Sequence, residues 1–188
     1  MNEQHAICGS DEWRAVVRDF ILPWALRDVD LGDDVLEVGP GYGATTDVLG
    51  TSVPRLTAVE IDDDLAAMLT ERFAANPAVE IVRGDATALP FPDDRFSGAT
   101  SFTMLHHVPS LALQDRLFAE VARVLRPGGV LVAGDSLASD DLEALHDGDT
   151  YVPVDPASLP ARLAACGYVD VDVKVNDFGW AAVARAPG

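Results

Sequence analysis

The stretch DVLEVGPGYG (residues 34–43) decides the fold class of this 188-residue chain. Its first part is a short, mostly apolar run, which is typical of a strand buried on both faces of a parallel sheet. The run ends at Gly39, Gly41 and Gly43, which let the backbone turn sharply and approach a ligand closely. A helix that follows such a loop offers unpaired N–H groups to a bound molecule. The stretch therefore predicts a strand–loop–helix unit that binds a ligand at its loop.

The rest of the chain alternates between strand and helix patterns and closes with a hairpin. Strands are expected at 34–39, 55–62, 78–85, 97–102, 130–136, 168–175 and 179–185. Helices are expected from Ser10, with Pro23 kinking or ending the first, and at 43–50, 63–76, 112–125, 139–146 and 156–166. This alternation predicts an α/β fold, a three-layer Rossmann-like sandwich around a mostly parallel sheet. We expect a single domain with an N-terminal helical extension (1–30), a core (33–136) and C-terminal helices with the hairpin (137–188).

Charge and composition exclude several classes of partner. The chain has 31 acidic and 13 basic residues, for a net charge of −18. Nucleic acid and anionic membrane surfaces need a basic footprint, so neither is expected as the main partner. No apolar run is long enough for a membrane span, and the N-terminus has no secretory pattern, so we expect a cytoplasmic protein. Cys8 and Cys166 lie near opposite ends without metal-ligand spacing, which argues against a disulfide framework.

Three acids stand where the predicted strands meet the loop side of the sheet. Glu37 lies inside the first apolar strand, where a buried carboxylate needs a positive or hydrogen-bonding partner. A cofactor with an ammonium and a sulfonium charge would supply that partner, whereas a pyrophosphate would be repelled. Glu60 ends the second strand and can accept both hydroxyls of a ribose, which suits nicotinamide and other adenosine cofactors alike. Asp85 can accept a hydrogen bond from an adenine amine, or it can cap a turn.

Five motifs in order resemble a known family. They are E-x-G-x-G-x-G at 37–43, the acid Glu60, GDA at 84–86 followed by LPF at 89–91, LHHV at 105–108 and LRPGGVL at 125–131. Together they resemble class I S-adenosylmethionine-dependent methyltransferases, nearest to the small-molecule group that includes ubiquinone/menaquinone biosynthesis methyltransferases. The resemblance implies a seven-stranded sheet of order 3-2-1-4-5-7-6 with strand 7 antiparallel. It also implies S-adenosyl-L-methionine as cofactor and direct methyl transfer to a small-molecule acceptor.

The resemblance implies a cofactor role for residues at the ends of the first four strands. It assigns Glu37 to the methionine amino group, Gly39, Gly41 and Gly43 to the wrapping loop, Glu60 to the ribose hydroxyls, Ile61 to the adenine face, Asp85 and Ala86 to the adenine edge, and Ser101 and Phe102 to the methionine side. No metal ligand is implied.

The histidines are the candidates for acid–base chemistry. His106 and His107 follow the fourth strand and could act as a base if the acceptor is protonated. Adjacent residues on a helical turn point roughly 100° apart, so we expect at most one of them to face the pocket. His5 and His146 are expected at the surface.

Two departures from the family pattern bear on the substrate. The fourth strand opens with Phe96-Ser97 in place of Phe-Asp, at a position expected to be structural. The regions that cover the substrate in larger relatives are short, so we expect an open site, a small substrate, or a homodimer or partner that completes the pocket. The same shortness leaves a non-catalytic cofactor-binding or interaction protein as an alternative. A nicotinamide-dependent oxidoreductase is a weaker one, because the only lysine, Lys174, provides no Tyr-x-x-x-Lys motif.

Overall fold

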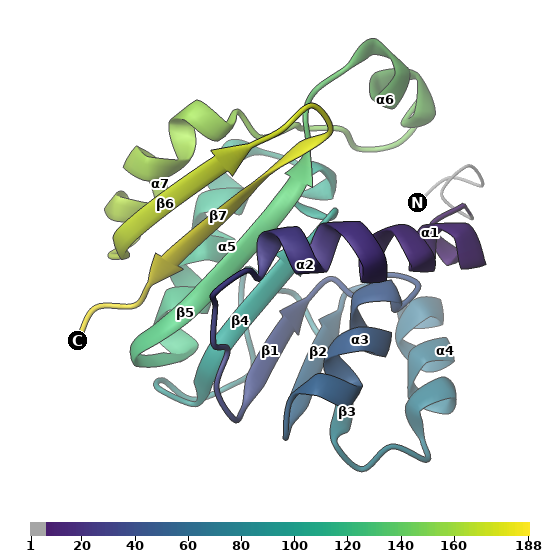
Figure 1. The fold of residues 1–188 in the computed structure, drawn as a ribbon, viewed down its shortest axis with the longest axis vertical. Helices are drawn as coiled ribbons and strands as arrows, with labels where there is room; N and C mark the ends of the chain where they lie inside the picture. The colour runs from purple at the N-terminus through teal and green to yellow at the C-terminus, as the bar shows by residue number, and fades with distance from the viewer. Residues whose placement is uncertain (1–6) are drawn as a thin grey trace.

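The structure is a computed structural model that describes residues 7–188. Its seven strands form one sheet of order β3-β2-β1-β4-β5-β7-β6, as predicted (Figure 1). The strands are β1 (Val35–Val38), β2 (Leu56–Glu60), β3 (Val79–Arg83), β4 (Phe96–Phe102), β5 (Leu125–Ser136), β6 (Val169–Val175) and β7 (Gly179–Arg185). β7 runs antiparallel to both β5 and β6, and the other neighbouring strands are parallel. The predicted fold class is therefore confirmed.

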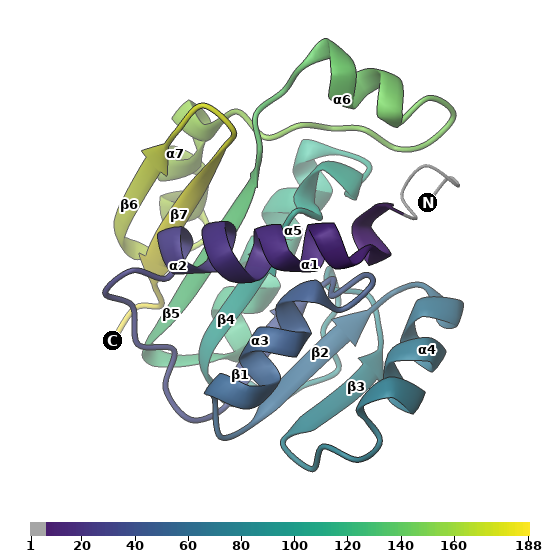
Figure 2. The same ribbon diagram turned by 45° about the vertical axis from the view of Figure 1, so that its right-hand side comes forward.

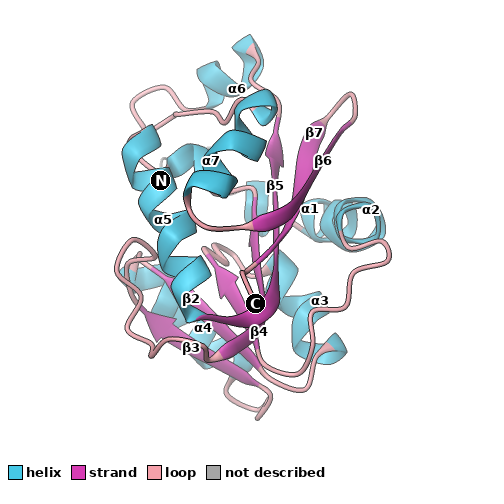
Figure 3. Ribbon diagram, turned by 90° about the vertical axis from the view of Figure 1, so that its left-hand side faces the viewer, coloured by secondary structure: helices cyan, strands magenta, loops and turns pink. Residues whose placement is uncertain are grey.

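Helices cover both faces of the sheet. They are α1 (Asp11–Val16), the π-helical η2 (Val17–Ile21), α2 (Leu22–Ala25), α3 (Ala44–Ser52), α4 (Asp63–Phe73), the 3₁₀ helix η3 (Leu105–His107), α5 (Leu111–Val124), α6 (Asp140–Leu145), the 3₁₀ helix η4 (Pro156–Ser158) and α7 (Leu159–Ala165). The helices α1, α2 and α3 lie on one face of the sheet, and α5 and α7 lie on the other (Figure 3). Each face has its own apolar core. Within residues 7–188, no helix has the length and apolarity needed to cross a bilayer.

The N-terminal helix begins where the sequence predicts and continues past its proline. The Ser10 side chain accepts a hydrogen bond from the Trp13 N–H at 3.1 Å, which caps α1. The π-helical turn Val17–Ile21 precedes Pro23, and the helix ends only after Ala25. The wider π turn relieves the clash between a proline ring and the carbonyl four residues earlier. The resulting long helix crosses the sheet in front of β4 and β5 (Figure 2).

Ser97 replaces the usual aspartate at the start of β4 and has a structural role. Its hydroxyl accepts a hydrogen bond from the Asp34 N–H at 2.9 Å and approaches the Leu31 carbonyl at 2.8 Å. These contacts join the segment before β1 to the start of β4, at the end of the strands opposite the glycine loop. The departure from the family pattern therefore does not affect the site at the C-terminal ends of the strands.

Candidate active site

The three loop glycines have left-handed backbone conformations but different surroundings. The φ angles of Gly39, Gly41 and Gly43 are 67°, 54° and 79°. A Cβ added to Gly39 would lie 2.8 Å from Met104, and one added to Gly43 would lie 2.7 Å from Leu69. A Cβ added to Gly41 would meet nothing within 4 Å. Gly39 and Gly43 are thus required by packing within the protein, whereas Gly41 faces open space where a ligand can approach the backbone.

Glu60 holds the loop in place. One carboxylate oxygen, Oε2, accepts a hydrogen bond from the Gly41 N–H at 2.9 Å, and Oε1 accepts one from the Asp62 N–H at 3.0 Å. The side chain is buried, yet it borders the cavity beside the loop. Because each carboxylate oxygen has more than one lone pair, both can still accept a hydrogen bond from a ligand hydroxyl. The arrangement suits a ribose diol.

Glu37 is a buried acid without a compensating charge. Its side chain is 2% exposed, and Oε2 has no hydrogen-bond partner in the part of the chain that the structure describes. Burial raises the pKa of the Glu37 carboxyl to about 8; the neighbouring Thr46 side chain opposes this rise, and the charges of Asp47 and Glu60 add to it. An ammonium group brought near this carboxyl would offset the cost of its burial.

A cavity of about 260 Å³ adjoins the loop and is called here the glycine-loop cavity. The structure brings several of the predicted site residues to its wall. These are Gly39, Gly41, Glu60, Ile61, Phe102 and His107. Ile61 is 60% exposed, an unusual position for an isoleucine and one that suits packing against a flat ring.

The other predicted residues do not border this cavity. They are Glu37, Gly43, Asp85, Ala86, Ser101 and His106. Asp85 is exposed, and its carboxylate accepts hydrogen bonds from the N–H and the hydroxyl of Thr87, both at 2.8 Å. Ala86 packs against the core and Ser101 is buried in β4. A direct cofactor role for these residues remains a prediction.

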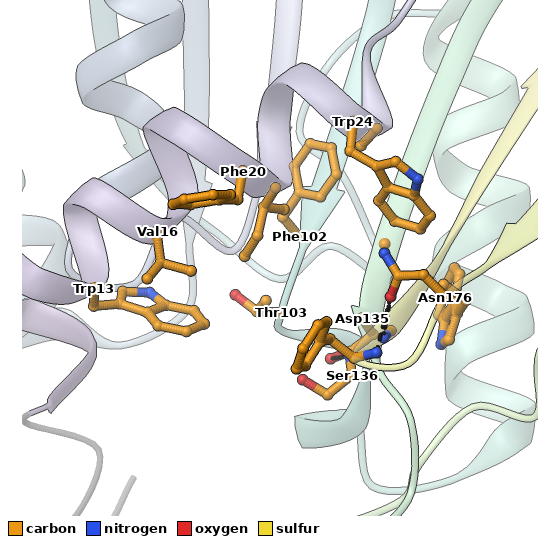
Figure 4. A pocket seen from close by; sticks show the side chains of 15 residues that line it. Trp13, Val16, Phe20, Trp24, Phe102, Thr103, Asp135, Ser136 and Asn176 are labelled. Carbon is orange, nitrogen blue, oxygen red and sulfur yellow. Dashed lines mark hydrogen bonds between the residues drawn. The ribbon is translucent and has the colours of Figure 1, made fainter.

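A second cavity, of about 540 Å³, lies under the N-terminal helix and is called here the apolar cavity. Figure 4 shows side chains of the helix on one side of it and the ends of β4 and β5 with the β6–β7 turn on the other. The helix contributes Trp13, Val16, Phe20, Ile21, Trp24 and Ala25. Apolar residues of this helix are both buried and exposed: Val17 is buried, whereas Phe20 is 71% exposed. The sequence analysis missed this pocket, and the aromatic residues that recur along the helix, Trp13, Phe20 and Trp24, are the signal that could have indicated it.

The two cavities meet at Trp13, Phe102 and Thr103, which border both. Thr103 has a φ of 52°, a left-handed conformation that β-branched residues rarely adopt. Its N–H donates to the Gly134 carbonyl at 2.8 Å, which holds the chain in this turn between β4 and η3. Strained residues of this kind are concentrated at functional sites.

The histidines are arranged differently from expectation. Only His107 borders the glycine-loop cavity. His106 turns instead to Asp135, with Nδ1 at 2.8 and 2.9 Å from the two carboxylate oxygens. His146 was expected at the surface, but it is 3% exposed and its ring lies against those of His106 and His107. The expectation was wrong because the segment after α6 folds back over η3. His5 lies outside the described residues.

Comparisons with known proteins agree with this geometry. The family model described as "Methyltransferase domain" matches residues 36–133, more than half of the chain. A demethylmenaquinone methyltransferase of Clavibacter sepedonicus is 32% identical over 127 residues, covering 66% of this chain and 47% of that protein. A ribosomal RNA small subunit methyltransferase A of Geobacter sulfurreducens is 46% identical over 61 residues, covering 32% and 22%. The chain spans between about a fifth and a half of the length of such curated relatives.

Solved structures show the same fold at low identity. A methyltransferase from Bacillus halodurans C-125 superposes with a TM-score of 0.72 at 19% identity, covering 91% of this chain and all of that one. A phosphoethanolamine N-methyltransferase 2 of Haemonchus contortus, in complex with S-adenosyl-L-methionine, gives a TM-score of 0.73 at 15% identity, covering 89% and 51%. The open space at Gly41 and the unpaired Glu37 oxygen fit S-adenosylmethionine, the cofactor of this family. The chain therefore belongs to the class I S-adenosylmethionine-dependent methyltransferases, and among them it resembles the enzymes of menaquinone biosynthesis.

Proposed function

We propose that this chain transfers the methyl group of S-adenosylmethionine to a small, largely apolar acceptor bound in the apolar cavity. The single observation that supports this most is the junction of the two cavities. An acceptor beneath the N-terminal helix and a cofactor beside the glycine loop would meet at Trp13, Phe102 and Thr103. Direct displacement requires such an end-to-end arrangement, because the protein accelerates the reaction mainly by aligning the two reactants.

On the cofactor side, the chain's own residues bind and orient. S-adenosylmethionine supplies a methyl group made electrophilic by its sulfonium charge. Glu60 would accept the ribose hydroxyls, Ile61 would pack on the adenine, and Glu37 would face the methionine amino group. The open face of Gly41 would admit the cofactor close to the backbone. The assignments of Gly39, Gly43, Asp85, Ala86, Ser101 and Phe102 stay part of the proposal.

On the acceptor side, the walls favour an apolar molecule with one polar atom. Aromatic side chains dominate the helix side of the apolar cavity, and Thr103, Asp135 and Ser136 place polar groups at the strand ends (Figure 4). The names of two relatives point to acceptors of this kind. One is the demethylmenaquinone methyltransferase, and the other is a phthiotriol/phenolphthiotriol dimycocerosates methyltransferase 1 of Mycobacterium ulcerans, 35% identical over 112 residues.

A general base is required only if the attacking atom is protonated. His106 and His107 remain the predicted candidates, and the carboxylate of Asp135 orients the His106 ring as such a base requires. Neither histidine borders the apolar cavity, whereas Asp135 does. An acceptor whose attacking atom carries no proton, or a phenol acidic enough to ionise without a base, would fit this geometry best.

Methylation of ribosomal RNA is a second candidate, because several relatives bear that name. Their similarity covers between 31% and 55% of this chain. The net charge of −18 opposes binding to a phosphate backbone. A cofactor-binding protein without catalysis is the remaining alternative.

We also propose that residues 1–188 act as one domain, and that a second copy or a partner completes the open side of the apolar cavity, where Phe20 and Phe178 are exposed.

The test is a methyl-transfer screen with isotopically labelled S-adenosylmethionine. Quinols, phenols, long-chain alcohols and amines form one arm, and small-subunit ribosomal RNA forms the other. The proposal expects transfer to members of the first arm, weakened when Phe20 is replaced by serine. Transfer to RNA alone would favour the second candidate. Binding of S-adenosylhomocysteine without transfer to any acceptor would favour the non-catalytic alternative.

A further inference from the structure

Three of the chain's histidines converge beside the glycine-loop cavity. His106 and His107 belong to η3, directly after β4, and His146 follows α6. The ring centroids lie 4.2 Å apart for His106 and His107, 4.9 Å for His106 and His146, and 5.0 Å for His107 and His146. One ring nitrogen from each residue lies within 4.8 Å of those from the other two. We propose that these three imidazoles form a binding site for a divalent transition-metal ion of the Zn²⁺ class.

Two of the rings make outer contacts of the kind that metal-bound histidines make. His106 presents Nδ1 to the carboxylate of Asp135, whose side chain is 1% exposed. His146 presents Nδ1 to the Leu142 carbonyl at 2.6 Å. In both cases the acceptor oxygen places a proton on Nδ1, so we expect a metal to be bound through Nε2. Metal-bound histidines in proteins make this kind of second contact to a carboxylate or a backbone carbonyl.

The site is held together by contacts that do not depend on a metal. The Val152 N–H donates to the His106 carbonyl at 2.7 Å, which fixes the segment after α6 against η3. The Gln114 side chain donates to the carbonyls of Leu105 and Val152, at 3.1 and 2.9 Å. His146 also stacks on Tyr151, with ring centroids 4.6 Å apart. The three rings are therefore preorganised by the fold.

The ligand chemistry selects the type of ion. Three imidazoles suit Zn²⁺, Co²⁺, Ni²⁺ or Cu²⁺, whereas Mg²⁺ and Ca²⁺ prefer oxygen ligands. Zinc–nitrogen bonds of about 2.0–2.1 Å in a tetrahedron place the nitrogens roughly 3.3 Å apart. The widest pair must therefore close by at most about 1.5 Å, which side-chain rotation can supply. A three-histidine site leaves a fourth position for water or another ligand.

A metal here would act as a clamp on the cofactor site. His107 borders the glycine-loop cavity, and so do Asp149 and Thr150, which closely follow His146. An ion shared by η3 and the segment after α6 would hold these residues at the cavity wall. We therefore expect metal and cofactor to bind cooperatively, by fivefold or more in affinity, roughly the lower bound of ordinary coupling between sites.

The experiment measures metal binding without any acceptor, so it is independent of the proposed function. Tag-free protein, stripped with a chelator, is titrated with Zn²⁺ by calorimetry and with Co²⁺ by visible absorption. The proposal expects one Zn²⁺ per chain with a micromolar or tighter Kd, a tetrahedral Co²⁺ spectrum, and no competition from Mg²⁺. His107→Gln and His146→Gln should each weaken binding tenfold or more, and His5→Gln should bind as the unaltered chain does.

Asp135→Asn provides a second test of the metal site, because this variant keeps all three histidine ligands. Removing such an outer contact typically costs about 10- to 100-fold in metal affinity. Circular dichroism and thermal unfolding in chelator establish that each variant is folded, and if His146→Gln does not fold, His107→Gln and Asp135→Asn decide. Absence of saturable binding, equal competition by Mg²⁺, or unchanged affinity in folded His107→Gln would overturn the site. Equal affinity for S-adenosylhomocysteine with and without Zn²⁺ would overturn the clamp.

Discussion

Replacing Glu37 by glutamine should stabilise the cofactor-free protein at alkaline pH and weaken its binding of S-adenosylhomocysteine. Glutamine has nearly the same volume as glutamate but no charge. The variant therefore removes the cost of ionising a carboxyl that is 2% exposed and leaves the packing of β1 in place. It also removes the negative charge that we assign to the cofactor's ammonium group. Stability and binding should thus change in opposite directions.

The magnitude follows from the pKa of Glu37. The carboxyl ionises near pH 8 in the folded chain and near its ordinary pKa of 4.5 in the unfolded chain. Between these values the folded chain holds the proton and the unfolded chain does not, so the free energy of unfolding falls as the pH rises. At about 1.4 kcal/mol for each tenfold change in proton affinity, the full loss is roughly 5 kcal/mol, reached above about pH 8. Below pH 4.5 this contribution vanishes.

The assay is urea unfolding of both proteins across this range. The difference in free energy of unfolding between variant and unaltered protein should grow by several kcal/mol from about pH 5 to about pH 9. Glu71→Gln, on the exposed side of α4, is the matched control and should show no such growth. If the difference for Glu37→Gln is independent of pH, the carboxyl ionises normally in the folded chain and the reasoning fails.

Three further substitutions test the cavities. Gly41→Val should abolish binding of S-adenosylhomocysteine, as measured by calorimetry. The control is Gly128→Val, at a position that also has a positive φ and open space around it, and it should lower the thermal midpoint similarly but leave binding intact. Equal binding by the two variants would refute the loop assignment. Glu60→Ala should weaken binding of S-adenosylhomocysteine by about 1.5–3 kcal/mol, because the Gly41 N–H and the ribose lose a charged acceptor. An unchanged Kd would show that Glu60 is not part of the site. Phe20→Ser should raise the KM of an apolar acceptor without changing cofactor affinity, whereas Val175→Ser, exposed outside the cavity, should change neither.

The sheet could be predicted because its signals are local. Apolar runs of strand length, such as 35–38 and 56–60, alternate with helix patterns, and this alternation restricts the topology to few solutions. The loop glycines were predictable because left-handed backbone excludes most other residues. Element boundaries were less accurate. The strand β5 begins at Leu125, directly after α5, and so includes residues 125–129, whereas the sequence predicts a helix up to 125 and a strand only from 130.

The cavities and the histidine cluster depend on contacts that the sequence does not specify. An apolar helical face such as that of residues 13–21 is typical of a helix packed against the core. Only the tertiary structure shows that much of this face lines an open cavity. His146 lies in an acidic stretch without periodicity, so its path back over η3 could not be deduced. Glu37 was identified from its place in an apolar strand, and its burial is confirmed.

The central claim is that Glu37 is a neutral buried acid that ionises when the cofactor's ammonium group arrives. The most direct test counts the protons released when S-adenosylhomocysteine binds at about pH 7, by calorimetry in buffers of different ionisation enthalpy. The account predicts release of close to one proton per chain, and none from Glu37→Gln. Binding to the unaltered protein without proton release would contradict it.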